Sequence, residues 1–219
     1  MPTSMTASET SALLLLATAA SFTPGPNTTL STALAANRGL RGALRFVLAV
    51  PVGWGLLLGA CALGLGSIVV ALPWLRWAIV LTGLAYLLWL AAKLARATQL
   101  SDADPRRLNV GFWQGVALQF VNIKAWMLAL AVVAGWIAGR PDALERTLFV
   151  LPLMVAFGGV SNLTYALMGA LLRHWLAGPV IDGTPTGLRL RRFNRTMAAL
   201  LVLTAVWMLY SHLTPGATS

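Results

Sequence analysis

Long apolar segments without a charged residue alternate with short charged segments along almost the whole chain. A helix needs roughly 20 mainly apolar residues to cross the hydrocarbon core of a bilayer. Four of the charge-free stretches reach that length unaided, and two more reach it once a lysine is included at or near one end. The pattern therefore predicts an all-α integral membrane protein with six transmembrane helices. The expected spans are residues 11–36, 46–72, 75–95, 112–138, 147–172 and 196–213.

A cleaved signal peptide is the alternative interpretation of the first span. The apolar stretch 11–20 followed by Ser21 has the length and small residues of a signal sequence, but Glu9 and no basic residue precedes it. Because the charge-free stretch continues far beyond a signal's length, a membrane span is favoured over a signal peptide.

Composition agrees with a membrane protein and excludes a soluble domain. Of the 219 residues, 58% are hydrophobic and 10% are charged, and mean hydropathy is +0.77. Soluble domains are nearer 45–50% apolar and about 25% charged. Since each polar segment is short, residues 1–219 are expected to form a single transmembrane domain.

Charge sets the expected orientation. The chain carries 16 Lys and Arg against 6 Asp and Glu. Most of the basic residues lie in the three predicted loops that follow spans 1, 3 and 5, and cytoplasmic loops are the ones enriched in Lys and Arg. With six spans, both termini are then expected on the side opposite the cytoplasm.

Helix-breaking residues in the first span form the first candidate binding cluster. The motif is Thr23-Pro24-Gly25-Pro26-Asn27. Two prolines remove two backbone donors and leave carbonyls of the preceding turn unpaired. The break offers partly negative carbonyls near Thr23 and partly positive amides from Asn27 through Thr28 to Leu30, which suit an ammonium and a carboxylate. A purely structural kink is the alternative.

Polar residues in the fourth span form the second cluster: Gln119, Asn122 and Lys124. At 1.5 Å per residue, Asn122 and Asn27 both lie near the expected midplane. A membrane lysine costs roughly 2.5–3.5 kcal/mol on insertion scales. Lys124 is therefore expected to bind an anionic group or carry a transported proton, or else to hydrogen-bond neighbouring carbonyls for structural reasons.

Matching clusters in spans 1 and 4 predict a 3+3 inverted repeat, because three helices per repeat force opposite orientations and transporters bind substrate where such repeats meet. Asn162 in span 5 and Tyr86 in span 3 are further candidate lining residues, although each alone is more typical of an interhelical hydrogen bond. All six acidic residues fall in expected termini or loops. A coupled proton would then travel on Lys124, on the substrate amine or on a group near an interface.

Other classes of protein fit less well. A membrane serine hydrolase would need a histidine near Ser161, but His174 and His212 lie at expected interfaces. A single cysteine, Cys61, allows neither an intrachain disulfide nor a thiol relay. A channel would need a continuous polar path. A non-transporting membrane scaffold or assembly protein stays open as the alternative.

At the two clusters the chain resembles the LysE/RhtB family of bacterial amino-acid exporters. The matching motifs are Pro24-Gly25-Pro26 in the first span and Asn122-Ile123-Lys124 in the fourth, with further matches at 37–42, 83–89 and 191–195. Ile123 replaces the family's usual proline, which leaves open whether span 4 is broken. The stretch 117–124 looks most like the cysteine and O-acetylserine exporter branch.

This resemblance implies export of small neutral amino acids or derivatives, of the cysteine, O-acetylserine or threonine type, driven by the proton gradient. It implies no enzymatic activity, no cofactor, no metal and no nucleic acid. Glycine pairs such as Gly55 and Gly59 leave a homodimer open. The expected substrate-binding residues are Thr23, Pro24, Gly25, Pro26, Asn27, Thr28, Tyr86, Gln119, Asn122, Lys124 and Asn162.

Overall fold

The protein is a bundle of helices, as expected for the all-α class. The computed structural model describes residues 5–97, 110–178, 180–181, 184–185 and 187–213. Four helices, or five spans if the bent pair α5 and α6 is counted as one, are long and apolar enough to cross a membrane. The elements are α1 (Ala7–Phe22), α2 (Pro26–Ala62), α3 (Leu65–Ala71), α4 (Pro73–Arg96), α5 (Phe112–Val121), α6 (Ile123–Val132), the π-helix η1 (Val133–Ile137), α7 (Ala143–Ala177), β1 (Val180–Ile181), β2 (Thr184–Pro185) and α8 (Leu188–Leu213).

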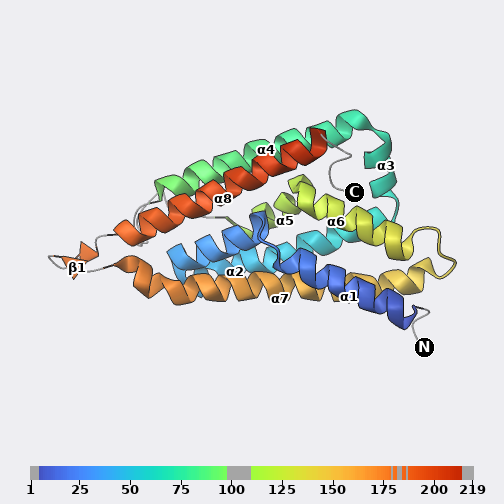
Figure 1. Ribbon diagram of the computed structural model, residues 1–219, viewed down its shortest axis with the longest axis horizontal. Coiled ribbons are helices and arrows are strands. Elements are labelled where there is room, and N and C mark those ends of the chain that lie inside the picture. Colours follow the sequence, from blue (N-terminus) through green and yellow to red (C-terminus); the bar gives the residue numbers. More distant parts are fainter. Residues whose placement is uncertain (1–4, 98–109, 179, 182–183, 186, 214–219) are drawn as a thin grey trace.

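Helix α2 is two helical segments joined at one residue. Gly39 has φ 72° and ψ 168°, a left-handed backbone conformation that glycine adopts without the steric cost of a Cβ. The chain turns back at this point, so that both parts of α2 run along the length of the bundle (Figure 1). The predicted loop around residues 37–45 is therefore reduced to a break at a single glycine.

Three further expected boundaries were wrong. The expected span 46–72 stops at Ala62, because Leu63 and a left-handed Gly64 interrupt the helix before α3. Helix α7 begins at Ala143 and ends at Ala177, longer at both ends than the expected 147–172. Helix α8 begins at Leu188 instead of 196, because the basic segment 188–195, predicted as a loop, is helical.

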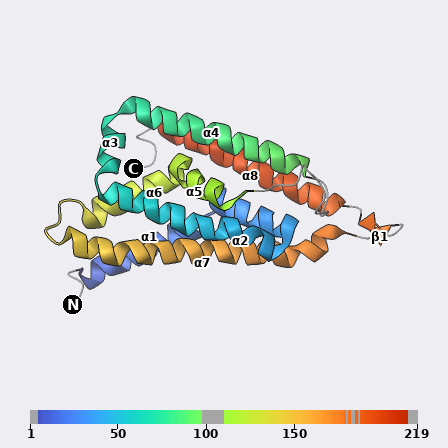
Figure 2. The ribbon, with the colours of Figure 1, turned by 180° about the vertical axis from the view of Figure 1, so that it is seen from behind.

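The helices form two groups with α5 and α6 between them. Helices α4 and α8 lie side by side along one edge, and α2 packs along α7 on the other, with α1 beside them (Figures 1 and 2). One buried apolar cluster joins α2, α4, α5 and α8, and a second joins α1, α2, α6 and α7. The first cluster therefore joins the two groups, and the second holds α1 and α6 against α2 and α7.

A buried amide pair joins the two groups near one end of the bundle. Asn37 Nδ2 donates to Asn194 Oδ1 at 2.8 Å, and Asn194 Nδ2 donates back to Asn37 Oδ1 at 3.0 Å. Asn194 also donates to the Ala97 carbonyl just after α4. Both asparagines have 0% exposure. This end, where α4 and α7 finish and α8 begins, also carries the basic residues of those segments and of the turn at Gly39.

Helices α4 and α5 approach each other closely at Gly83. A Cβ placed on Gly83 would lie 2.0 Å from the Val121 carbonyl oxygen, so even one methyl group must push the two backbones apart. Val121 is the last residue of α5 before the bend, so this contact holds the bend against α4.

We predict that Gly83→Ala lowers the free energy of unfolding by about 1–3 kcal/mol, the usual cost of overpacking a tight interior contact. Thermal unfolding of the detergent-solubilised protein measures the effect. Gly135→Ala is the matched control, because a Cβ there meets no atom within 4 Å. Equal unfolding temperatures for the two variants would contradict the prediction.

Candidate substrate-binding site

The predicted break in the first span is present, and three of its freed carbonyls are bound by side chains. Helix α1 ends at Phe22 and α2 begins at Pro26. The Ser161 hydroxyl donates to the Ser21 carbonyl, and the Tyr165 hydroxyl donates to the Phe22 carbonyl at 2.9 Å. Lys124 Nζ donates to the Thr23 carbonyl at 2.8 Å. The negative end of α1 is therefore satisfied by donors from α6 and α7.

The same break exposes the N-terminal end of α2. Gly25 is extended, and its N–H donates to the Thr28 hydroxyl at 2.9 Å. Thr29 N–H donates to the Gly25 carbonyl and so begins the regular helical pattern. The backbone amides before Thr29 lie in the first turn, which carries the positive end of the helix dipole. Asn27 and Thr28 both border the cavity described below.

The fourth span is broken as well, at Asn122. Helix α5 ends at Val121, α6 begins at Ile123, and the two are bent by 66°. The Asn122 side chain accepts the Lys124 backbone N–H at 3.1 Å and so caps α6. An asparagine cap thus starts a new helix here without the proline that the resemblance would have supplied.

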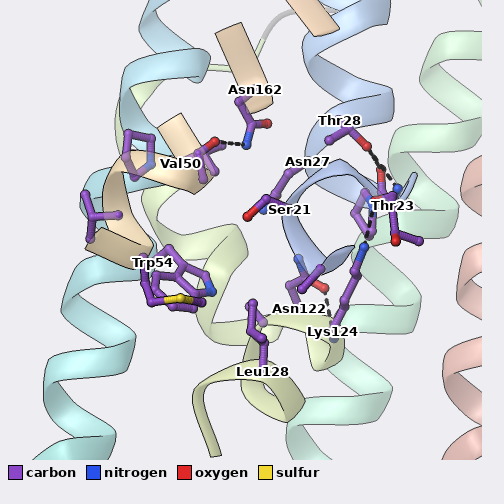
Figure 3. Close-up of a pocket in the computed structure, with 18 residues that line it drawn as sticks. Ser21, Thr23, Asn27, Thr28, Val50, Trp54, Asn122, Lys124, Leu128 and Asn162 are labelled. Atoms are coloured by element: carbon purple, nitrogen blue, oxygen red, sulfur yellow. Dashed lines mark hydrogen bonds between the residues drawn. The ribbon is translucent and has the colours of Figure 1, made fainter. Parts of the chain in front are cut away.

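The two breaks border a single cavity of about 60 Å³ (Figure 3). That volume holds several water molecules or a small side chain. One side of the cavity is mainly polar and the other is apolar. The polar side is formed by Ser21, Thr23, Asn27, Thr28, Asn122, Lys124 and Asn162, and the apolar side by Val50, Pro51, Trp54, Leu128, Met154 and Val155.

Most of the predicted site residues are brought together here. Thr23, Gly25, Pro26, Asn27, Thr28, Asn122, Lys124 and Asn162 line the cavity. Pro24 and Gln119 do not line it, although Gln119 binds Asn27 directly. Tyr86 lies elsewhere, on α4, where its ring stacks on Trp89 at 5.6 Å and its buried hydroxyl has no hydrogen-bond partner among the described residues. The prediction that Tyr86 lines the site is therefore not supported by its position.

Hydrogen bonds hold the amide side chains of Asn27 and Asn162 in place. Asn27 Nδ2 donates to Gln119 Oε1 at 2.8 Å, and Gln119 Nε2 donates to Asn27 Oδ1 at 3.1 Å. Asn162 Oδ1 accepts from the Ser31 hydroxyl, and Asn162 Nδ2 donates to the Gly158 carbonyl. These pairs fix the break in α1 and α2 against α5 and α7.

Lys124 is the one ionisable residue among those that line the cavity. Its side chain lies against Gly25, where a Cβ would be 3.2 Å from Lys124 Cδ and 3.3 Å from Nζ. Among the described residues, the ion pairs that the structure contains involve Glu9 and Asp142 with Arg140 and Arg146, not Lys124. The ammonium group is therefore held by a backbone carbonyl rather than by a carboxylate.

A second charged cluster, which the sequence did not reveal, lies at the end of the bundle that holds the start of α1. Arg146, expected in a loop, is only 6% exposed in the first turn of α7. It bridges Glu9 at 3.1 Å and Asp142 at 2.9 Å, while Trp136 Nε1 donates to the Glu9 carbonyl. The Thr6 backbone N–H and the Arg146 side chain lower the pKa of Glu9 from 4.5 to about 2. No sequence motif linked Glu9 to Arg146, because 137 positions separate them.

Comparison with known proteins agrees with the motifs. The LysE type translocator family matches residues 18–212, so the chain belongs to that family of membrane transporters. Both breaks, between Phe22 and Pro26 and at Asn122, fall inside the matched region. No solved structure matched the chain.

Three relatives share most of their length with it, and each is named cysteine/O-acetylserine efflux protein. The Klebsiella pneumoniae protein is 32% identical over 92% of this chain and 97% of its own length. The proteins of Salmonella typhimurium and Escherichia coli K12 are each 30% identical over 86% of this chain and 91% of their own length. The predicted resemblance to this family and branch is confirmed.

We predict that Glu9→Gln lowers the unfolding temperature at pH 7, because glutamine cannot form the ion pair with Arg146. Since the folded protein holds the pKa of Glu9 below its ordinary value, the stabilisation is present above pH 4.5 and is lost as pH falls toward 2. The difference between variant and wild type should shrink over that range. Thermal unfolding in detergent from pH 7 to 2 tests this.

Glu145→Gln is the control. It removes a carboxylate from the turn of α7 that carries Arg146, but it leaves both ion pairs of Arg146 unchanged. A pH-independent difference between Glu9→Gln and wild type would show that the ion pair is not the source of the effect.

Proposed function

We propose that this chain exports small neutral amino acids or their derivatives, of the cysteine, O-acetylserine or threonine type, across the bacterial inner membrane. The observation that carries the proposal is the shared cavity between two broken helices. The C-terminal end of α1 offers carbonyls for an ammonium, and the N-terminal ends of α2 and α6 offer positive potential for a carboxylate. A zwitterion carries both groups within a few ångströms of each other.

The size and lining of the cavity favour a small substrate. A volume of about 60 Å³ leaves little room beyond a zwitterionic head and a short side chain. Trp54, Met154 and Leu128 would contact that side chain, since they form the apolar wall. The names of the relatives support cysteine and O-acetylserine as the first substrates to test.

We propose six spans, one more than the five obtained when the bent pair α5 and α6 is counted as one. Helix α1 and the part of α2 before Gly39 form one span, and the part of α2 after Gly39 forms the next. The others are α4, the bent helix from α5 to η1, α7 and α8. Each set of three then opens on a broken helix, which supports the 3+3 inverted repeat.

Export is tested in proteoliposomes loaded with radiolabelled cysteine or O-acetylserine. We expect label-loaded liposomes that contain the wild-type protein to release the label faster than loaded liposomes without protein. Release should be faster still with an inward proton gradient, in which protons move opposite to the substrate. Lys124→Ala and Asn27→Ala should abolish release, because one removes the cavity's cation and the other leaves the buried Gln119 amide without its partner.

Lys93→Ala is the matched control. Lys93 lies over the Trp89 ring near the end of α4, outside the cavity, so its loss should leave release unchanged. All variants should insert in the membrane. Wild-type rates in both Lys124→Ala and Asn27→Ala would refute this placement of the site, and failure of wild type to release any amino acid would favour a non-transporting scaffold.

The proposed orientation places the basic end of the bundle in the cytoplasm and both termini outside. Full-length chains fused at the C-terminus to alkaline phosphatase or to green fluorescent protein test it. We expect active phosphatase and dark fluorescent protein, because phosphatase folds only outside the cytoplasm and this fluorescent protein only inside. A bright fluorescent fusion would show that the C-terminus lies in the cytoplasm and would contradict the proposed orientation.

A further inference from the structure

The contact between Lys124 and Thr23 places a lysine ammonium at the position that best suits the ammonium of a substrate. The Thr23 carbonyl lies at the negative end of α1 and borders the cavity. Its partner is Lys124 Nζ at 2.8 Å (Figure 3). The neighbouring carbonyls of Ser21 and Phe22 accept from hydroxyl groups, which carry no charge. Among these three carbonyls, Thr23 is the one that holds a cation.

We infer that Lys124 is a resident cation that the substrate ammonium displaces from the Thr23 carbonyl. The inference rests on the proposed export of amino acids and adds its coupling step. An α-ammonium and a lysine ammonium are the same chemical group, and each donates up to three hydrogen bonds. Two ammonium groups at one carbonyl would repel each other strongly, because no carboxylate lines the cavity.

A substrate carboxylate gives the displaced lysine a new partner. Lys124 stands on the first turn of α6, and the first turn of α2 lies on the same cavity. A zwitterion with its ammonium on Thr23 has its carboxylate within the same small cavity, where Lys124 can turn to meet it. Charge is then paired in both states: Lys124 with the α1 terminus when empty, and with the substrate carboxylate when loaded.

This exchange separates two modes of transport. Net efflux requires the empty carrier to return, and the contact of Lys124 with Thr23 keeps that state free of a bare helix end in the cavity. Exchange of substrate for substrate never passes through the empty carrier. Loss of Lys124 should therefore reduce net efflux much more than exchange.

The experiment measures both rates for each variant in proteoliposomes with radiolabelled cysteine, with and without unlabelled cysteine on the opposite side. In Lys124→Met the ratio of net efflux to exchange should fall at least tenfold. Gly25→Val should act in the same direction, because its side chain occupies the space beside Lys124 Cδ and Nζ and holds the ammonium away from Thr23. Size-exclusion chromatography checks that each variant is folded.

Tyr165→Phe is the matched control, since it removes a neutral donor from the adjacent carbonyl of Phe22. Both rates should change together, with their ratio within twofold of wild type. Inhibition adds a chemical test: O-acetylserine should compete for exchange, and its isomer N-acetylserine, which lacks an ammonium, should not.

An unchanged ratio in folded Lys124→Met overturns the inference, and if that variant does not fold, an unchanged ratio in Gly25→Val does so. Competition by N-acetylserine equal to that of O-acetylserine also overturns it. These outcomes differ from failure of the proposed function, in which wild-type protein moves no amino acid in either mode and both conclusions fall.

Discussion

Backbone carbonyls without helical partners, placed inside a membrane protein, are the constraint on which this structure depends. Hydrocarbon offers no water to satisfy them, so the protein must supply donors from neighbouring helices. Ser161, Tyr165 and Lys124 meet that need at the end of α1. The positions of α6 and α7 beside the break follow from it, and so does the cavity between them.

The break and its chemistry could be predicted from the sequence, because proline has the same effect on the backbone in every fold. Pro24 and Pro26 have no N–H in any fold, so unpaired carbonyls before them could be predicted without knowing the neighbours. The deep position of Lys124 could also be predicted from its place among apolar residues. What could not be predicted was that these two features are partners, since 101 positions separate Lys124 from Thr23.

Boundaries and distant pairs were harder to predict for a related reason. A window of apolar residues looks the same whether or not a glycine such as Gly39 or Gly64 turns left-handed within it. Because charge normally ends a span, the sequence predicts loops at Arg146 and at the basic start of α8, where the structure has helix. Arg146 has a partner far away in the sequence, Glu9, which a local pattern does not reveal.

The first span is fastened at both of its far ends and interrupted between them. Glu9 ties the beginning of α1 to α7 through Arg146, and Asn37 ties the other half to α8 through Asn194. The second half also packs on α7, where Asn162 accepts from the Ser31 hydroxyl. Both halves of the span are therefore held to α7, and the second is held to α8 as well. Bending of the chain between Phe22 and Pro26 would thus displace the Thr23 carbonyl, with the Lys124 ammonium on it, while both halves stay attached.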